Sequence, residues 1–241
     1  MAGAPQISVR DLTLAYGSYV VMHDVSFDVG RGDVFVIMGG SGSGKSTLLR
    51  ALIGLLAPAG GEVAFHGDQR FGVLFQGGAL WSDLTLGENV AVALEEQTSL
   101  SPARIRELVA LKLELVGLGG TQDLYPNQIS GGMQKRVGVA RAMALDPDIL
   151  FLDEPSAGLD PITAARLDDL ILQLREGLGT TMVVVSHDLA SIFRIGTDAI
   201  YLDAETRTVT ARGAPAELRD HPPNPQVHAF LTRSAGTEES S

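Results

Sequence analysis

The sequence predicts an α/β protein in which antiparallel strands precede a parallel central sheet. Near the N-terminus, residues 7–14 alternate apolar and polar side chains and residues 25–29 repeat the pattern, which is typical of half-buried antiparallel strands. Three later segments are continuously apolar, as strands buried on both faces are: residues 34–38, 149–152 and 182–185. A helical pattern at about 161–178 separates the last two. Buried strands that alternate with helices predict a parallel sheet.

The remaining elements are predicted from local signals. Residues 61–67 begin and end with a glycine, a turn residue, and the segment between them has the pattern of a half-exposed strand, so a further strand is predicted here. Ser101 and Pro102 begin a helix over 101–116, whose apolar face is expected to contain Ile105, Leu108, Val109, Leu115 and Val116. Residues 199–202 predict a last strand, which leads into a polar hairpin at about 205–210.

Composition limits the classes of protein that fit. A chain of 241 residues fits one large domain or two small ones, and no internal repeat or long linker divides it. With no cysteine, the chain has no disulfide, thiolate metal site or cysteine nucleophile. Eighteen Lys and Arg against 29 Asp and Glu give a net charge of −11, which argues against nucleic-acid binding and against a basic patch for anionic lipid.

The sequence shows the pattern of neither a membrane span nor a secretory signal. No segment reaches the roughly 18 apolar residues of a membrane span. Residues 1–10 lack the basic start and apolar core of a secretory signal. We therefore expect a soluble, cytoplasmic protein.

Residues 39–46 match the phosphate-binding pattern G-x-x-x-x-G-K-[ST], between a buried strand and a helical run, which is the context that the pattern requires. Glycines let the backbone wrap phosphates, and inward N–H groups with a helix N-terminus favour their charge. Lys45 is expected to reach the β- and γ-phosphates, and the Ser46 hydroxyl to bind Mg²⁺. A flexible Gly/Ser turn is the alternative, but Lys and Ser in register favour a P-loop NTPase core. The predicted nucleotide-binding residues are Gly39, Gly40, Ser41, Gly42, Ser43, Gly44, Lys45, Ser46 and Thr47.

Two acids, Asp153 and Glu154, follow the buried run 149–152. Ligands bind at the carboxyl ends of strands in open α/β sheets, so Asp153 is expected to hold Mg²⁺ and Glu154 to polarise the attacking water. Two solvated carboxylates that cap a strand are the alternative. His187 follows another buried strand, where it is expected to donate a hydrogen bond to the γ-phosphate, although a packed or capping histidine would fit there as well.

Residues 126–136, Pro-Asn-Gln-Ile-Ser-Gly-Gly-Met-Gln-Lys-Arg, resemble the signature segment of ABC ATPases, usually written L-S-G-G-Q. With the phosphate loop, this segment identifies the chain as similar to the ATP-binding subunits of ABC transporters over about residues 7–231. The resemblance implies a single nucleotide-binding domain over 1–233. It also implies an N-terminal antiparallel β subdomain and an inserted helical subdomain at about 77–136. The small and polar residues at the C-terminus separately predict a disordered tail at 234–241.

The family resemblance also implies roles for single residues. Tyr16 resembles the aromatic that stacks on adenine, although packing at a strand edge is the alternative. Gln76 matches the glutamine that contacts Mg²⁺ and the nucleophilic water. In this family two subunits pair head to tail, so a homodimer is expected. Its interface would be crossed by the loop that ends at Asp160, and ATP would be contacted from the partner by Ser130, Gly131 and Gly132. Ser130 is also a natural helix N-cap.

A closer resemblance is to the ATPases of Mce/Mla-type lipid transporters. It rests on residues 39–41, 75–81, Met133, 160–163 and 225–231. It implies phospholipid or another lipid as cargo, with a membrane permease and an Mce-type lipid-binding protein as partners. The chain would then lie on the cytoplasmic face of the inner membrane, attached through the permease. Trp81 and Leu84 are candidate permease contacts, and local packing is the alternative for Trp81.

Two departures and two other functions stay open. Met133 replaces the usual glutamine, which puts the hydrogen bond to the partner's ribose in doubt, and the connection from Gly67 to Phe71 is shorter than in relatives. An ABC importer or exporter for another substrate is one alternative. A soluble ABC-class ATPase that acts on nucleic acid or ribosomes is the other, and the single cassette, short helical insertion and acidic charge disfavour it.

Overall fold

The computed structural model describes residues 5–67 and 69–233, and the chain forms two compact units. Unit 1 is Met1–Asp68 with Val183–Ser241, and unit 2 is Gln69–Met182. The boundary falls within strand β7 (Thr181–Val185). The tail predicted at 234–241 lies outside the described residues.

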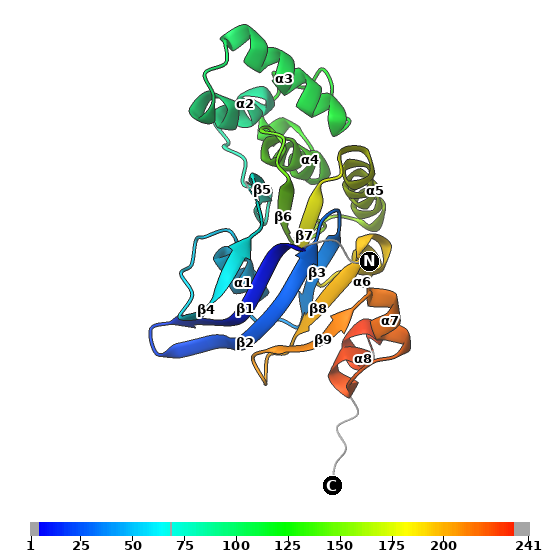
Figure 1. Cartoon of the computed structure of the whole chain (residues 1–241). Helices are drawn as coiled ribbons and strands as arrows, with labels where there is room; N and C mark the ends of the chain where they lie inside the picture. Colours follow the sequence, from blue (N-terminus) through cyan, green and yellow to red (C-terminus); the bar gives the residue numbers. More distant parts are fainter. Residues whose placement is uncertain (1–4, 68, 234–241) are drawn as a thin grey trace. The chain divides into compact units, whose positions relative to one another are not determined.

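Unit 1 begins with a three-stranded antiparallel sheet in the order β2-β1-β4 (Figure 1). Its strands are β1 (Pro5–Tyr16), β2 (Tyr19–Gly30) and β4 (Gly60–Phe65). Apolar residues of β2 and of the second half of β1 alternate into the core, as predicted for half-buried strands. The start of β1 differs, because the polar Gln6 and Ser8 are buried as well as Ile7 and Val9. The register shifts between Val9 and Leu12, where Asp11 has a φ of 47° and forms an irregularity of the bulge type.

The parallel strands of unit 1 carry the phosphate-binding motif. Strand β3 (Val34–Gly39) is buried over its whole length and pairs in parallel with β8 (Asp198–Leu202). β8 turns back antiparallel into β9 (Val209–Gly213), which confirms the predicted C-terminal hairpin. Helix α1 (Lys45–Leu52) follows β3 after the glycine-rich loop.

Three short helices complete unit 1: α6 (Leu189–Ile195), α7 (Pro215–Asp220) and α8 (Pro225–Thr232). They bury one core cluster with β3, β8 and β9, whose members include Val36, Met38, Leu189, Ile192, Tyr201, Leu218, Val227 and Leu231. The Phe230 ring packs edge-on against Tyr201 at 5.3 Å between centroids. The periodic signal of such short helices is weak, and none of the three was predicted.

Unit 2 holds a parallel pair, β5 (Phe71–Leu74) and β6 (Ile149–Asp153), with β6 fully buried. Gly72 of β5 is needed for this packing, because a Cβ there would collide with the carbonyl of Ala142. Helix α5 (Pro161–Leu178) leads from β6 to β7 and matches the predicted helical stretch.

The helical part of unit 2 comprises α2 (Leu86–Gln97), α3 (Pro102–Leu115) and α4 (Gly131–Ala142) (Figure 1). A short 3-10 helix, η1 (Pro126–Gln128), precedes α4. The sequence pattern did not predict α2. On α3 the buried side chains are Ile105, Val109, Lys112 and Leu113. Leu115 is 40% exposed, so its predicted place on the apolar face was wrong. At about 100° per residue, position 115 lies roughly a quarter turn away from the face that 105, 109 and 112 share.

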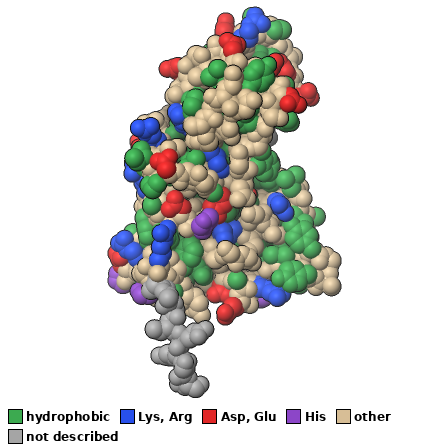
Figure 2. Space-filling view, turned by 180° about the vertical axis from the view of Figure 1, so that it is seen from behind, with side chains coloured by type: hydrophobic (Ala, Val, Ile, Leu, Met, Phe, Trp, Pro, Cys, Tyr) green, Lys and Arg blue, Asp and Glu red, His purple; other side chains and the backbone are tan. Residues whose placement is uncertain are grey.

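The surface carries charges of both signs. On the face shown in Figure 2, Lys and Arg side chains are interspersed with Asp and Glu. A helix that would span a bilayer is not found among residues 5–67 and 69–233.

Candidate functional site

The phosphate-binding loop of unit 1 is shaped by glycines in conformations that other residues avoid. Gly42 and Gly44 have φ values of 77° and 90°, and Gly44 is the N-cap of α1. A Cβ on Gly44 would lie 2.7 Å from Met22 Cε. The loop therefore delivers the chain to the N-terminus of α1, where the first N–H groups have no acceptor within the helix and favour an anion.

Two polar side chains of this loop fit an anionic ligand. Lys45 Nζ donates to the carbonyl oxygens of Gly39 and Gly40, at 2.9 and 2.8 Å, which folds the ammonium over the loop. Ser43 is 3% exposed, and its Oγ has no hydrogen-bond partner among the described residues. A buried hydroxyl without a partner is costly unless a ligand satisfies it. These observations fit a bound phosphate.

Tyr16 and His187 also belong to unit 1. Tyr16 ends β1, is 48% exposed and pairs across the hairpin with Tyr19, so both side chains lie on one face of the sheet. His187 is exposed and follows β7 directly after the buried Ser186. Neither side chain is buried in the core, so both can be reached from the surface of unit 1.

The two acids of unit 2 stand at the carboxyl end of β6. Asp153 and Glu154 are 9% and 8% exposed, so they are not the solvated strand cap that was considered as an alternative. Glu154 has a φ of 49°, a left-handed conformation that is uncommon outside glycine. Its carbonyl accepts hydrogen bonds from the backbone N–H of Ala157 and from Lys135 Nζ, both at 3.2 Å.

The signature segment opens α4. Ser130 is the N-cap, and its Oγ accepts a hydrogen bond from Met133 N at 3.3 Å. Ser130 and Gly131 are exposed, whereas Gly132 is buried. A Cβ on Gly132 would collide with Thr163 Cγ2, so this glycine lets α4 approach the start of α5 closely.

The loop after β6 ends at Asp160, the N-cap of α5. Asp160 Oδ1 accepts from the N–H groups of Ile162 and Thr163, both at 3.1 Å, and Oδ2 accepts from the Thr163 hydroxyl. The Thr163 hydrogen bonds hold the pKa of Asp160 below its ordinary value. Because Thr163 also contacts Gly132, the structure brings Asp160 and the signature segment together within unit 2.

Gln76 lies in an exposed glycine-containing turn after β5. Trp81 follows it, is 50% exposed and stacks on the guanidinium of Arg141 at 5.0 Å. Arg141 also donates to the carbonyls of Gly78 and Ala79. Leu84 is half-buried, so of the two candidate permease contacts only Trp81 is exposed.

The chain is similar to known proteins over most of its length. The family model described as ABC transporter matches residues 22–157. The chain is 39% identical over 239 residues to the Escherichia coli K12 protein named intermembrane phospholipid transport system ATP-binding protein MlaF, covering 93% of this chain and 88% of the relative. It is 42% identical to the probable ribonucleotide transport ATP-binding protein mkl of Mycobacterium leprae, over 76% of this chain and 57% of the relative.

The chain belongs to the ATP-binding proteins of ABC transporters. It is an ABC ATPase. Among solved structures, it resembles cbiO1 from Clostridium perfringens, described as part of the ABC transporter complex cbiONQ, with a TM-score of 0.82 and 26% identity over 90% of this chain and 91% of that one. It also resembles the ATP-binding cassette MJ0796 in a dimeric, post-hydrolysis state bound to ADP and Pi. There the TM-score is 0.77 and the identity 30%, over 86% of this chain and 98% of that one.

Two buried polar residues of the ABC ATPase were not singled out from the sequence. Asn89 is fully buried on α2 and holds the segment from Trp81 to Thr85 through four hydrogen bonds. Lys135 is 5% exposed on α4 and binds Glu154. A polar residue at a buried helical position is the available sequence signal, and it becomes visible only once the buried face of the helix is known.

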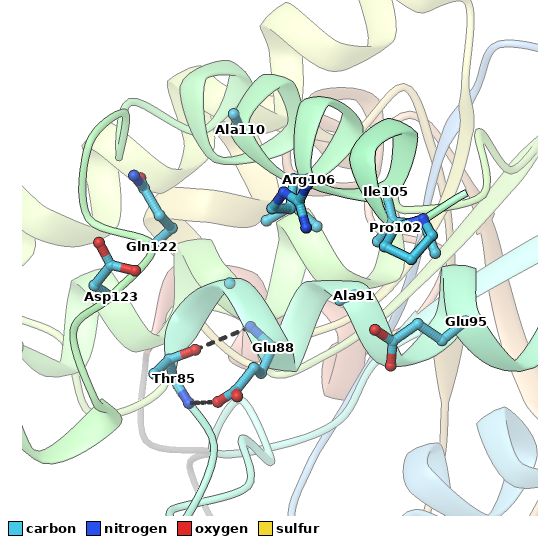
Figure 3. Close-up of a pocket in the computed structure, with 12 residues that line it drawn as sticks. Thr85, Glu88, Ala91, Glu95, Pro102, Ile105, Arg106, Ala110, Gln122 and Asp123 are labelled. Carbon is cyan, nitrogen blue, oxygen red and sulfur yellow. Dashed lines mark hydrogen bonds between the residues drawn. The ribbon is translucent and has the colours of Figure 1, made fainter. Parts of the chain in front are cut away.

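A cavity of about 480 Å³ lies between α2 and α3 of the ABC ATPase (Figure 3). At its edge, Thr85 and Glu88 form the capping box that begins α2. Its other polar lining residues are Glu95, Arg106, Gln122 and Asp123. None of the residues predicted to bind nucleotide lines this cavity.

Proposed function

We propose that this ABC ATPase hydrolyses ATP to drive a separate membrane permease that moves phospholipid or another lipid. The observation that carries the proposal is the 39% identity with a phospholipid transport ATP-binding protein over 93% of the chain. Because this identity covers nearly the whole chain, it supports the same cargo that the resemblance to Mce/Mla-type ATPases implies. The partners would be an integral membrane permease and an Mce-type lipid-binding protein, and nucleic acid would not be one.

ATP would be held by the loop of residues 39–47. Its N–H groups and Lys45 would bind the phosphates, and Tyr16 would stack on adenine. The partnerless Ser43 hydroxyl and the position of Lys45 over the loop support an anion there. His187 would donate a hydrogen bond to the γ-phosphate.

Mg²⁺ would be held by Ser46, Gln76 and Asp153 together with the phosphates of ATP. Oxygen donors suit this ion, which binds through one or two carboxylates rather than an all-protein cage. When bound, the ion neutralises charge that develops on the phosphates.

Glu154 would act as the general base. Its carboxylate would accept a proton from the water that attacks the γ-phosphorus, and the ADP leaving group would depart with the electron pair of the broken P–O bond. The burial of Glu154 at the end of β6 supports this role, because a base shielded from bulk water is held in one orientation.

Two subunits would pair head to tail, so that Ser130, Gly131 and Gly132 of one subunit face the phosphate loop of the other across ATP. The exposed Ser130 and the N-terminus of α4 offer a second anion site that is complete only when a partner brings it nucleotide. Asp160 would contribute to this interface. The dimeric structure of MJ0796, at 30% identity, supports the arrangement.

We assign residues 1–233 to one nucleotide-binding domain with a helical subdomain at about 77–136. The permease would contact the groove of about 410 Å³ beside Trp81, which is also lined by Phe71, Phe75, Ala93 and Arg141. Half-exposed aromatic rings beside an arginine are typical of the energetic centre of a protein interface. This contact would hold the chain on the cytoplasmic face of the inner membrane.

Purification of the tagged chain from its own cells in mild detergent tests the proposal. We expect a membrane permease, an Mce-type protein and phospholipid to accompany it. Trp81→Ala should reduce the recovered permease about tenfold or more and leave ATP binding unchanged. Leu111→Ala, which truncates a 53% exposed side chain of the same unit outside the groove, is the matched control.

Recovery of a permease without lipid, or with a nucleotide cargo such as the name of mkl indicates, would contradict the lipid assignment and leave the transporter assignment in place. Recovery of ribosomes or nucleic acid in place of membrane proteins would contradict both assignments. Loss of ATP binding together with permease binding in Trp81→Ala would contradict the contact at the groove.

A further inference from the structure

Lys135 is a buried lysine that lies against the backbone of the proposed base. It projects from α4, is 5% exposed, and its Nζ donates to the carbonyl oxygen of Glu154 at 3.2 Å. Lysine is almost never fully buried unless a partner compensates its charge. Here the carboxylates of Asp153 and Glu154 are close enough to interact with the ammonium.

The backbone that Lys135 binds is in an unfavourable conformation. Glu154 has a φ of 49°, and non-glycine residues keep such a conformation only where their surroundings hold it. Two donors hold the Glu154 carbonyl: the N–H of Ala157, which belongs to the same loop, and Lys135, which belongs to a different element. The lysine ties this carbonyl to a rigid helix outside the loop.

The position of the carboxylate depends on that backbone. Rotation of Glu154 out of the left-handed region would swing its Cα–Cβ bond to a new direction and carry the carboxylate away from its place at the end of β6. A displacement of about 1 Å at a reacting group is enough to cost on the order of 100-fold in rate. A side chain that prevents this rotation therefore affects the chemical step and not the binding of nucleotide.

The helix that carries Lys135 is the one that begins at Ser130. The two residues are five positions apart, about 7.5 Å along a rigid α-helix. The Ser130 end of α4 is the part that we expect to meet the partner's ATP. Through Lys135, the same helix is tied to the base of its own subunit.

We propose that Lys135 is a positioning residue for hydrolysis: it holds the backbone of Glu154 in its left-handed conformation and anchors the base to the helix that begins at Ser130. The proposal rests on the proposed role of Glu154 as general base. In this role Lys135 would act through Glu154 and would not itself contact the nucleotide or the attacking water.

Lys135→Met and Lys135→Arg test the proposal by steady-state ATP hydrolysis. Lys135→Met, which keeps most of the buried volume but has no donor, should lower kcat about tenfold or more. Its KM for ATP should stay within about twofold. Lys135→Arg restores a charged donor and should recover most of kcat. Lys135→Gln, which is neutral and shorter, should stay clearly below Lys135→Arg and tests the role even if Lys135→Met fails to fold.

Lys112→Met is the matched control, because Lys112 is another buried lysine of unit 2 that pairs instead with Asp146 on the surface. It should lower the melting temperature without changing kcat well below that temperature. A second readout uses the Glu154→Gln background, in which added Lys135→Met should leave ATP-dependent dimerisation unchanged.

The positioning role is overturned if Lys135→Met hydrolyses ATP at the rate of the unaltered chain. It is also overturned if Lys135→Arg and Lys135→Gln lose activity equally, or if kcat falls equally in Lys112→Met. Failure of the underlying function looks different: Glu154→Gln alone would then retain hydrolysis, whatever the substitutions at Lys135 do.

Discussion

The side chain of Asn89 makes four hydrogen bonds to the backbone of the segment that precedes α2. Its Oδ1 accepts from Trp81 N, and its Nδ2 donates to the carbonyls of Trp81, Leu84 and Thr85 at 2.9 to 3.1 Å. The residue is fully buried. Asn89→Ala removes all four side-chain bonds. The carbonyls of Trp81 and Thr85 keep the N–H groups of Leu84 and Asn89, whereas Trp81 N and the Leu84 carbonyl lose the partner that Asn89 supplies, so we expect the free energy of unfolding to fall by about 2–3 kcal/mol. Urea denaturation followed by the fluorescence of Trp81, the one tryptophan of the chain, measures the change.

Asn127→Ala is the control for this substitution, because Asn127 is exposed in the same unit. Its stability should change by no more than about 0.5 kcal/mol. If the two variants unfold at the same urea concentration, the hydrogen bonds of Asn89 contribute nothing net to stability.

The C-terminal end of α5 contains two glycines with different backbone conformations, one helical and one left-handed. Gly177 lies in the last helical turn, and Gly179 is the C-cap with a φ of 67°. A Cβ would meet no atom within 4 Å at either position, so backbone conformation alone distinguishes them. Gly177→Ala should raise the free energy of unfolding by about 0.5–1 kcal/mol, because alanine favours the helix. Gly179→Ala should lower it by about 1–2 kcal/mol, because the left-handed conformation is strained for alanine.

Differential scanning calorimetry of these two variants measures both changes in stability. A difference of 1 kcal/mol moves the melting temperature by about 2–4 °C in a chain of this size. Melting temperatures that shift in the same direction would mean that contacts formed by the new methyl group, and not backbone conformation, decide the effect.

For the molecule as a whole, ATP should control the number of subunits in the particle. Glu154→Gln keeps the shape of the side chain but removes the base, so we expect ATP turnover to fall about 100-fold or more. ATP should then persist between the paired subunits, and sedimentation should detect a dimer with ATP and a monomer with ADP. Glu96→Gln, on an exposed acid of the same unit, is the control and should behave as the unaltered chain does.

A Glu154→Gln variant that hydrolyses ATP at a near-normal rate would exclude Glu154 as the base. A variant that is inactive yet remains monomeric at saturating ATP would instead exclude nucleotide-driven pairing. The two results separate the chemistry of one subunit from the assembly of two.

The strands and most longer helices were predictable because their patterns are local. Residues 34–38 and 149–152 are continuously apolar, and both strands are buried over their whole length in the structure. The start of α5 at Pro161 follows from a capping Asp160 and a proline at the first helical position. Leu115 was misplaced because hydrophobicity alone put it on the apolar face of α3, where the geometry of the helix buries Lys112 instead.

The phosphate-binding motif of this chain could be predicted from the sequence alone, because phosphate binding requires particular residue types at a short, constant spacing. Glycines allow the left-handed backbone, and Lys45 and Ser46 follow at the start of a helix. No such spacing rule predicts that Lys135 donates a hydrogen bond to the Glu154 carbonyl, or that Asn89 holds the segment from Trp81 to Thr85. Those contacts join residues on different elements, and they exist only after packing has buried each side chain beside its partner. Burial makes an unmatched polar group costly, so the folded chain settles which of its polar residues support the site.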